Sequence, residues 1–408
     1  MFRSLGNAFR GQILNTVAKI VFWSVLSAAT ALVFLFWGMW GCSIAIAAIA
    51  VIEFLLRDNS DEFFQEKSVN LKKIPKLILE RNYEFFPEEE KINWVHDGEL
   101  GWRLKPNTEL GINISIPGLG LNHKFTYRTD ENGTRRTSND LLISKKQRPV
   151  VAILGCSFTY GHSLDDQDTY AWLLQERFSD KRVINYAVAG YSLYQCLLTL
   201  EKNIEKDNPG VVVVGFHPDL GWRNTNSFEW IRLIRHTWRI PSCVSKGGRL
   251  YRYSPDGYVS LPFSRLRIVK MLELNLNRLI YRGRGKKIVI RNTMKHLLLL
   301  IRALCEQHGA KLIVACIDDS SDYYDFLIKN GFCWCVTGVD TKELAEDGKF
   351  RWILYPFDNH PNQEANQKYA EAIGNSIEDL LVGRYSAPEV LQRNFKTEER
   401  GAYIYPHF

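Results

Sequence analysis

Uninterrupted apolar runs alternate with amphipathic stretches through the second half of the chain. The apolar runs, which predict buried strands, lie at 150–154, 183–188, 211–216 and 311–317. The amphipathic stretches, which predict helices, lie at 169–178, 195–204, 294–307, 323–329 and 363–381. Strands without polar alternation, interleaved with helices, are typical of a parallel sheet covered on both faces. We therefore expect a doubly wound α/β domain with its ligand site at the carboxyl ends of the strands.

A run of 33 residues near the N-terminus, 20–52, carries no charged side chain and predicts a membrane segment. As one helix it would extend roughly 50 Å, against about 30 Å of hydrocarbon. One long span and a tight hairpin with arms at 20–36 and 42–56 both fit, because basic residues flank both ends of the run. A single span with the N-terminus inside places the rest of the chain outside the cytoplasm, whereas a hairpin returns it to the cytoplasmic face.

The pattern divides the chain into five parts. The first is the membrane anchor, and the second is a helical connector. The third is a small β-rich add-on, in which Gly, Pro and Asn punctuate short β-prone pieces. The fourth is the α/β domain, and the last is a tail without recognisable features. Their ranges are 1–57, 58–95, 96–147, 148–385 and 386–408.

A basic insertion, 219–294, interrupts the α/β pattern. Its 16 Arg and Lys residues stand against four acidic ones, an excess greater than the net charge of +7 of the whole chain. Such a surface attracts phospholipid headgroups or an anionic polymer, unless acidic patches elsewhere balance it. No nucleic-acid-binding motif accompanies the charge, so nucleic acid is not an expected partner. Trp222, Trp230 and Trp238 fit either a sugar-binding surface or core packing.

Composition excludes disorder, because the 408 residues are 46% hydrophobic and 12% aromatic. The eight cysteines do not fix the redox compartment. Cys333 and Cys335 lack the two-residue spacing of a zinc or redox pair. We expect the cysteines to pack as small hydrophobes and propose no metal site.

Two distant segments carry a candidate nucleophile and its base. Ser157 follows the first predicted strand, between glycines at 155 and 161, where a strand-to-helix turn presents a hydroxyl beside free backbone N–H groups. A serine needs a neighbouring base, and the base needs a group that fixes its tautomer. Asp358 and His360 stand just before the last predicted helix and supply both. A parallel sheet can bring the two segments to one edge.

These segments resemble the motifs of the SGNH (GDSL-like) hydrolase superfamily. Ser157 matches the serine of the first block, in Gly-Cys-Ser-Phe-Thr-Tyr-Gly, and Gly190 matches the glycine of the second block. Asp358 and His360 match the last block. The Asn-Gly-x-Arg-Arg element at 132–136 resembles the leader of membrane-anchored members, and the likeness covers about residues 98 to 385.

The sequence departs from the family pattern at two positions. His217 stands where the family has an asparagine that donates to the oxyanion. The resemblance then leaves the N–H groups of Ser157 and Gly190, with His217 or Asn224 as a third donor; loss of one donor costs roughly 100-fold to 1000-fold in rate. Cys156 replaces an aspartate, and we interpret it as a packing residue.

The resemblance implies a membrane-anchored serine esterase or O-acyltransferase that needs no cofactor. The anchor points to acyl esters of a cell-envelope carbohydrate or glycolipid, and the family favours the periplasmic side of a bacterial inner membrane. The alternative is a catalytically silent module that binds a polysaccharide within an envelope assembly machine. The lost asparagine and the basic insertion favour that alternative, and the intact Ser157, Asp358 and His360 oppose it.

Overall fold

The computed structural model describes residues 93–116, 120–139, 149–234 and 239–385, together with helical residues at 21, 23–25 and 27–29. Nearly all of the predicted anchor and connector, and the whole tail, lie outside the described residues. Among the helices that are described, none combines the length and the apolar character needed to cross a bilayer. The anchor therefore stays a prediction.

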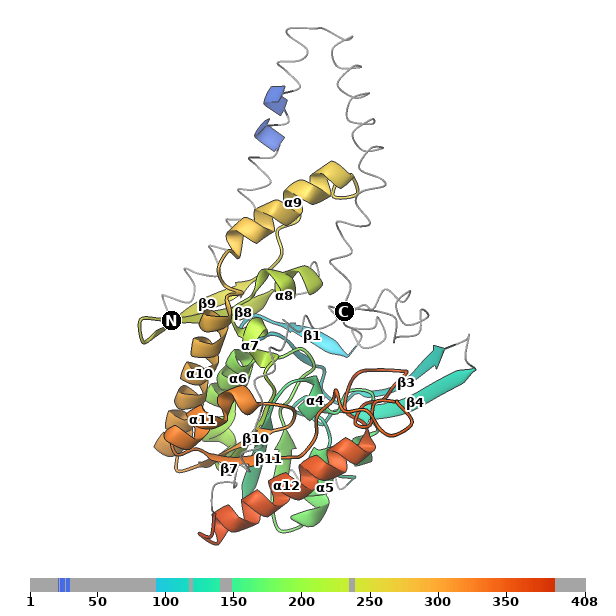
Figure 1. The fold of residues 1–408 in the computed structure, drawn as a ribbon, viewed down its shortest axis with the longest axis vertical. Coiled ribbons are helices and arrows are strands. Elements are labelled where there is room, and N and C mark those ends of the chain that lie inside the picture. The colour runs from blue at the N-terminus through green and yellow to red at the C-terminus, as the bar shows by residue number, and fades with distance from the viewer. Residues whose placement is uncertain are drawn as a thin grey trace.

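A parallel sheet of five strands forms the centre of the molecule (Figure 1). The strands lie in the order β11-β10-β7-β5-β6, and each neighbouring pair is parallel. In chain order this is the 2-1-3-4-5 arrangement of flavodoxin-like sheets, whose ligand crevice lies where the order reverses. Here that point lies between β5 and β7. The bounds are β5 Val150–Leu154, β6 Arg182–Asn185, β7 Pro209–Phe216, β10 Lys311–Cys316 and β11 Cys333–Val336.

Helices cover both faces of the sheet, as the uninterrupted apolar strands predict. Successive side chains of a strand point to opposite faces. Val151 and Ile153 of β5 therefore pack in one core with α5 and α12, while Ala152 and Leu154 pack in the other with α6 and α10. The helices are α5 Tyr170–Arg177, α6 Leu193–Asp207, α10 Lys287–Gln307, α11 Ser321–Lys329 and α12 Gln363–Leu381.

The elements differ from the predicted ones mainly at their ends. The second strand ends at Asn185 rather than at 188, and α10 begins at Lys287, seven residues before the predicted 294. Strand β11 was not anticipated, because four residues are too few to show a period. The seven described cysteines are free, and all but Cys333 are buried, so the packing interpretation is confirmed for them.

Two antiparallel hairpins occupy the region predicted to be β-rich. The first pairs β1 (Trp94–Asp97) with β2 (Gly101–Leu104), and the second pairs β3 (Glu109–Ile116) with β4 (Leu121–Arg128). The first hairpin is tied to the α/β domain by the hydroxyl of Tyr191, which donates to the carbonyl of Trp102 at 2.6 Å.

The described part of the insertion contains helices α7 to α9, one hairpin and the start of α10, with bounds α7 Leu220–Asn224, α8 Phe228–Leu233, β8 Ile240–Lys246, β9 Arg249–Asp256 and α9 Arg267–Ile280. The rings of Trp222 and Trp230 meet edge to face at 5.2 Å, and Trp230 is fully buried. Core packing is therefore the role of Trp230, while Trp238 lies outside the described residues.

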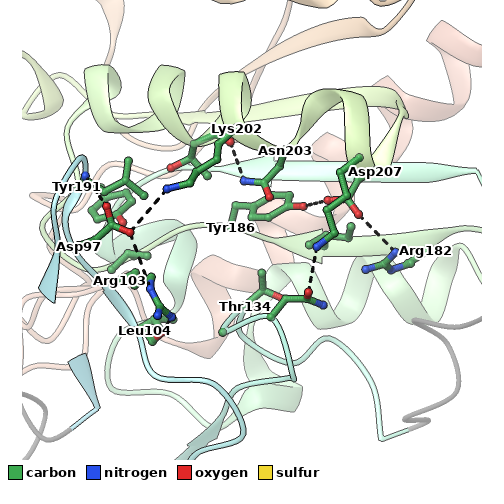
Figure 2. A pocket seen from close by; sticks show the side chains of 17 residues that line it. Asp97, Arg103, Leu104, Thr134, Arg182, Tyr186, Tyr191, Lys202, Asn203 and Asp207 are labelled. Carbon is green, nitrogen blue, oxygen red and sulfur yellow. Dashed lines mark hydrogen bonds and ion pairs between the residues drawn. The ribbon is translucent and has the colours of Figure 1, made fainter. Parts of the chain in front are cut away.

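A cavity of about 250 Å³ lies beside β6 and α6 (Figure 2). Most of its charged lining residues form ion pairs: Arg182 lies 3.7 Å from Asp207, and Lys202 lies 3.8 Å from Asp97. The hydroxyl of Tyr186 also donates to Asp207. The lining contains none of the predicted triad, so this cavity is separate from the catalytic candidate.

Candidate active site

Ser157 is the first residue of a short helix, α4 (Ser157–Tyr160), which begins three residues after β5 ends. The backbone of Cys156 is extended and caps this helix. N–H groups of a first helical turn have no acceptor within the helix, so the N–H of Ser157 is available to a ligand. The chain turns out of the helix at Gly161, whose φ of 80° favours glycine.

Two glycines let the serine turn pack closely against the sheet. A Cβ atom on Gly155 would lie 2.1 Å from Oγ1 of Thr159, and one on Gly215, near the end of β7, would lie 2.0 Å from the same atom. Neither distance is sterically possible. The amide of Asn185 donates to the carbonyl of Thr159 at 3.1 Å and links the turn to β6. The ends of three strands thereby position Ser157.

Asp358 and His360 lie in the loop before α12 and form a hydrogen-bonded pair. Nδ1 of His360 is 2.8 Å from Oδ1 of Asp358. Because a carboxylate accepts, this bond places the proton of the neutral ring on Nδ1 and its lone pair on Nε2, the arrangement that a general base requires. The Asp358 carboxylate also accepts from the hydroxyl of Ser163 at 2.6 Å and from the N–H of Asn359 at 2.7 Å.

The charge on Asp358 is stabilised inside the protein. Burial alone would raise the pKa of Asp358, but the positive charge and hydrogen bond of His360, the charge of His162 and the hydroxyl of Ser163 outweigh burial. The pKa of Asp358 therefore lies well below its usual range. The carboxylate is ionised at neutral pH and can balance an imidazolium at His360.

The serine and histidine segments lie at the same edge of the sheet. The ring of Phe158, the residue after Ser157, meets the His360 ring edge to face with centroids 5.6 Å apart. The segments are also joined by the bond from Ser163 to Asp358. No hydrogen bond joins Ser157 to His360 among the described residues, so their direct contact stays a prediction. Such contacts often close only when substrate binds.

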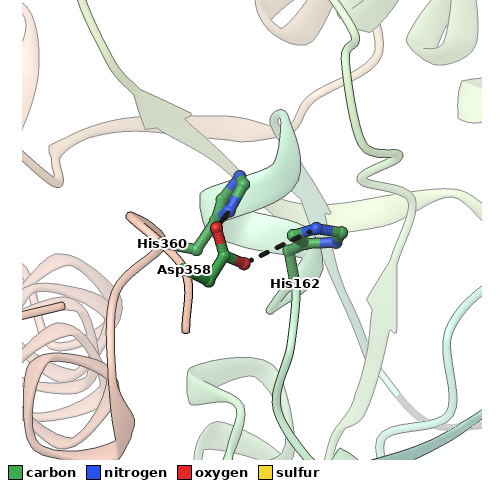
Figure 3. Close-up of side chains that lie close together, drawn as sticks. All are labelled: His162, Asp358 and His360. Atoms are coloured by element: carbon green, nitrogen blue, oxygen red, sulfur yellow. Dashed lines mark hydrogen bonds and ion pairs between the residues drawn. The ribbon is translucent and has the colours of Figure 1, made fainter. Parts of the chain in front are cut away.

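His162 completes the surroundings of Asp358, and no role was predicted for it from the sequence. Its Nε2 lies 3.6 Å from Oδ2 of Asp358, and its ring meets that of His360 edge to face at 4.2 Å (Figure 3). Asp358 thus lies between two imidazoles. The available signal was the position of His162 directly after Gly161, at the end of the serine motif.

The same three side chains are a group of potential metal ligands. One donor atom from each of His162, Asp358 and His360 lies within 4.8 Å of the others. Two imidazoles and a carboxylate suit a transition metal. A metal on Nδ1 of His360 would replace the proton through which Asp358 orients the ring, so metal binding and proton transfer by this pair exclude each other.

The predicted third oxyanion donors have other partners. Nδ1 of His217 accepts from the N–H of Asp219 at 3.1 Å, and Nε2 lies 3.0 Å from Oδ2 of Asp318. The amide of fully buried Asn224 accepts from the N–H of Tyr194 at 2.8 Å and donates to a methionine sulfur. Either side chain would have to break these bonds to reach an oxyanion.

The pairing of His217 also affects its partner. Burial would raise the pKa of Asp318, but the hydrogen bond and charge of His217, with N–H groups of Thr341 and Asp319, outweigh burial and lower the pKa to about 2.

Of the remaining predicted donors, Gly190 adopts a left-handed φ of 79°, which requires glycine in the loop after β6. The N–H groups of Ser157 and Gly190 remain the candidate oxyanion hole.

The Asn-Gly-x-Arg-Arg element holds the loop that follows Ser157. The buried guanidinium of Arg135 donates to the carbonyls of Tyr160, Gly161 and Leu164 at 2.7, 2.5 and 2.6 Å. It also donates to the buried carboxylate of Asp166 at 3.0 Å. With these hydrogen bonds, the planar guanidinium of Arg135 fixes the loop that carries His162 and Ser163.

Solved structures similar to this chain include esterases and a lipase. TesA is 15% identical with a TM-score of 0.29, and the match covers 57% of this chain and 99% of that one. The esterase EstA from Pseudoalteromonas is 13% identical with a TM-score of 0.32, and the match covers 57% of this chain and 98% of that one. A two-domain esterase active on acetylated mannans is 12% identical with a TM-score of 0.32, and the match covers 59% of this chain and 53% of that one.

No family model and no curated protein matches the sequence. Two further similar structures are described as a lipolytic protein of the G-D-S-L family, from Desulfitobacterium hafniense, and a GDSL-like lipase, from Bacteroides thetaiotaomicron. At this level of identity and TM-score, the chemistry of the present chain has to be argued from its own residues. The solved structures that this chain resembles thus include esterases and lipolytic proteins of the G-D-S-L family.

Proposed function

We propose that this protein is a serine esterase in which Ser157 is the nucleophile, His360 the general base and Asp358 the group that orients His360. The observation that carries the proposal is the 2.8 Å bond between Asp358 and His360, beside the helix that begins with Ser157. An ionised, largely buried carboxylate bound to Nδ1 of a histidine has the geometry of a catalytic triad. The N–H groups of Ser157 and Gly190 hold the oxyanion.

The reaction proceeds through an acyl-enzyme. Oγ of Ser157 bonds to the acyl carbon while its proton passes to Nε2 of His360, and the carbonyl oxygen becomes the oxyanion. His360 then gives the proton to the leaving oxygen as the ester C–O bond breaks, which releases an alcohol. Water attacks the acyl-enzyme, His360 takes a proton from the water and returns it to Oγ, and the carboxylic acid leaves.

Labelling with a fluorophosphonate probe tests this proposal. The full-length parent protein should be labelled, and Ser157→Ala should not, because the probe bonds only to an activated serine oxygen. Ser376→Ala, in α12 and outside the proposed site, is a matched control that leaves the proposed nucleophile in place and should still be labelled. An unlabelled parent with an intact fold, or equal labelling of Ser157→Ala, would refute the nucleophile.

The substrate class in this proposal is an acyl ester of a cell-envelope carbohydrate or glycolipid, reached by a membrane-anchored enzyme. The uncharged run at 20–52 supports the anchor. A sugar hydroxyl in place of water would make the same acyl-enzyme an O-acyltransferase. Product analysis with acetylated oligosaccharide, with and without an acceptor sugar, separates hydrolysis from transfer. A reporter fused after Phe408 distinguishes a periplasmic domain from a cytoplasmic one.

A catalytically silent, polysaccharide-binding module is the second candidate. The observation that favours it is His217, which replaces the asparagine donor of the family and is bonded to Asp318 and Asp219. A silent module would bind the polysaccharide but neither react with the probe nor cleave esters. The probe experiment therefore discriminates the two candidates directly.

A further inference from the structure

Helix α9 turns an apolar side toward the surface. Ile268, Leu272, Leu276 and Leu279 follow one another at helical spacing along one face. Leu272 is 54% exposed and Leu279 is 64% exposed. A surface helix of a globular domain normally turns polar residues toward water, so the exposed leucines of α9 depart from that pattern.

The inner face of the same helix holds two polar side chains beside the buried Val269 and Leu274. Glu273, which is 1% exposed, accepts from the N–H of Leu261 at 2.8 Å. Fully buried Asn277 accepts from the N–H of Val259 at 2.9 Å and donates to the carbonyl of the same residue, also at 2.9 Å. These bonds fix the rotation of α9, so Leu272 and Leu279 cannot turn inward. Leucines exposed to water in this fixed orientation raise the free energy of the protein, and contact with an apolar medium removes that penalty.

Basic residues surround the apolar face. The stretch 263–288 contains eight Arg and Lys residues and one acidic residue, Glu273, whose side chain faces inward. Positive charge beside an apolar helix face is the pattern of helices that lie in the interface of an anionic membrane. The exposed basic residues are Arg265, Arg278, Arg282, Lys286 and Lys287.

The apolar face continues toward the predicted membrane segment. Phe263, 55% exposed, precedes α9, and its ring lies 5.5 Å from that of Trp23. Trp23 belongs to the uncharged run at 20–52. In Figure 1, α9 lies at the same end of the molecule as the described helical residues of that run, and α12 lies at the other end.

We propose that α9 and the residue before it, Leu266, lie in the headgroup region of an anionic bilayer, with Leu272 and Leu279 in contact with lipid. The domain then rests on the membrane through this face. A second copy of the chain is a poorer occupant, because its docking on this face would oppose two basic surfaces. The inference concerns a surface remote from Ser157, and it holds or fails independently of the esterase activity.

Depth-dependent quenching tests the contact. The full-length protein, reconstituted in nanodiscs, is labelled with an environment-sensitive fluorophore at Leu272→Cys, at Leu279→Cys, or at the control Val382→Cys, which is 58% exposed just after α12. The parent protein, labelled identically, corrects for native cysteines. Spin-labelled lipid should quench the two α9 positions by roughly half or more, because an interfacial helix lies about 5–10 Å into the headgroup and acyl boundary. The control position should stay unquenched.

A comparison of anionic with zwitterionic lipid provides a second test. Quenching should be stronger with phosphatidylglycerol than with phosphatidylcholine alone, and the triple variant Arg278→Gln, Arg282→Gln, Lys286→Gln should lose this difference. Equal quenching at Leu272→Cys and Val382→Cys would overturn the proposal. Energy transfer between labelled copies at Leu272→Cys, without lipid quenching, would also overturn it and assign the face to a second copy. Fluorophosphonate labelling of each variant reports separately on the active site.

Discussion

Replacing Asp358 with asparagine tests the proposed triad at its most buried charge. The substitution keeps the shape of the side chain and one acceptor oxygen, which can still bind Nδ1 of His360. The new amide group would face the hydroxyl of Ser163, and that hydroxyl can rotate to accept. The variant therefore keeps the hydrogen-bond geometry but loses the negative charge that balances an imidazolium.

The expected loss follows from that charge. In the serine triad, this change lowers kcat about 10⁴-fold, which corresponds to roughly 5 kcal/mol of lost transition-state stabilisation at 1.36 kcal/mol per decade. KM should change little, because Asp358 does not touch the substrate in the proposed reaction. The assay is steady-state hydrolysis of a p-nitrophenyl ester by the full-length protein, with Asp347→Asn, in an exposed loop, as the matched control.

A double variant supplies the decisive comparison. If Asp358 acts only through His360 on Ser157, Asp358→Asn should cost little more in a protein that already carries Ser157→Ala. Multiplicative losses in the double variant would refute the reasoning, as would a single variant within about tenfold of the parent. Thermal unfolding at neutral pH verifies that each variant is folded.

Three further substitutions test the surroundings of the site. His162→Gln should lower kcat/KM, because the His162 ring packs edge to face on the His360 ring at 4.2 Å and its Nε2 lies 3.6 Å from Asp358; an unchanged kcat/KM would contradict this positioning role. Arg135→Lys should lower the free energy of unfolding in urea by roughly 3 kcal/mol, because an ammonium cannot replace the fork and leaves buried acceptors unpaired. A loss of unfolding free energy below the error of the urea measurement would show that Arg135 does not hold the loop after Ser157. A pKa of about 2 for Asp318, against 3.8, stabilises the fold by roughly 2 kcal/mol above about pH 4. This contribution disappears as pH falls through 2, so the difference between parent and Asp318→Asn in unfolding free energy should shrink over that range and not stay constant.

The sequence predicted the central sheet because its strands are buried on both faces and therefore lack polar alternation. Val151 and Ala152 are neighbours that enter opposite cores, and both positions demand apolar side chains. Element ends were harder to predict: the first turn of α10, from Lys287, is exposed or half-buried and mixes basic with apolar residues, so it shows no clear amphipathic pattern. Strand β11 is short and flanked by turns, so only its pairing with β10 defines it.

The candidate site was predictable where chemistry is local. Asp358 and His360 are two residues apart, and their bond follows from that spacing and a tight loop. The partner of His217 was not predictable, since Asp318 is 101 residues away and reaches it only through the pairing of β7 with β10. His162 likewise acquires its place from the loop that brings Asp358 to it.

The geometry of the loop after Ser157 depends on residues outside the α/β sheet. The N–H of Thr126 donates to Asp165 at 2.6 Å, Arg128 binds Asp166, and His123 donates to the carbonyl of Ser163 at 2.7 Å. These donors all come from β4. Ser163 in turn donates to Asp358, so the hairpin and the catalytic carboxylate are connected through one residue. The α/β sheet therefore places the serine, while the β-rich part of the chain fixes the loop that supports its acid partner.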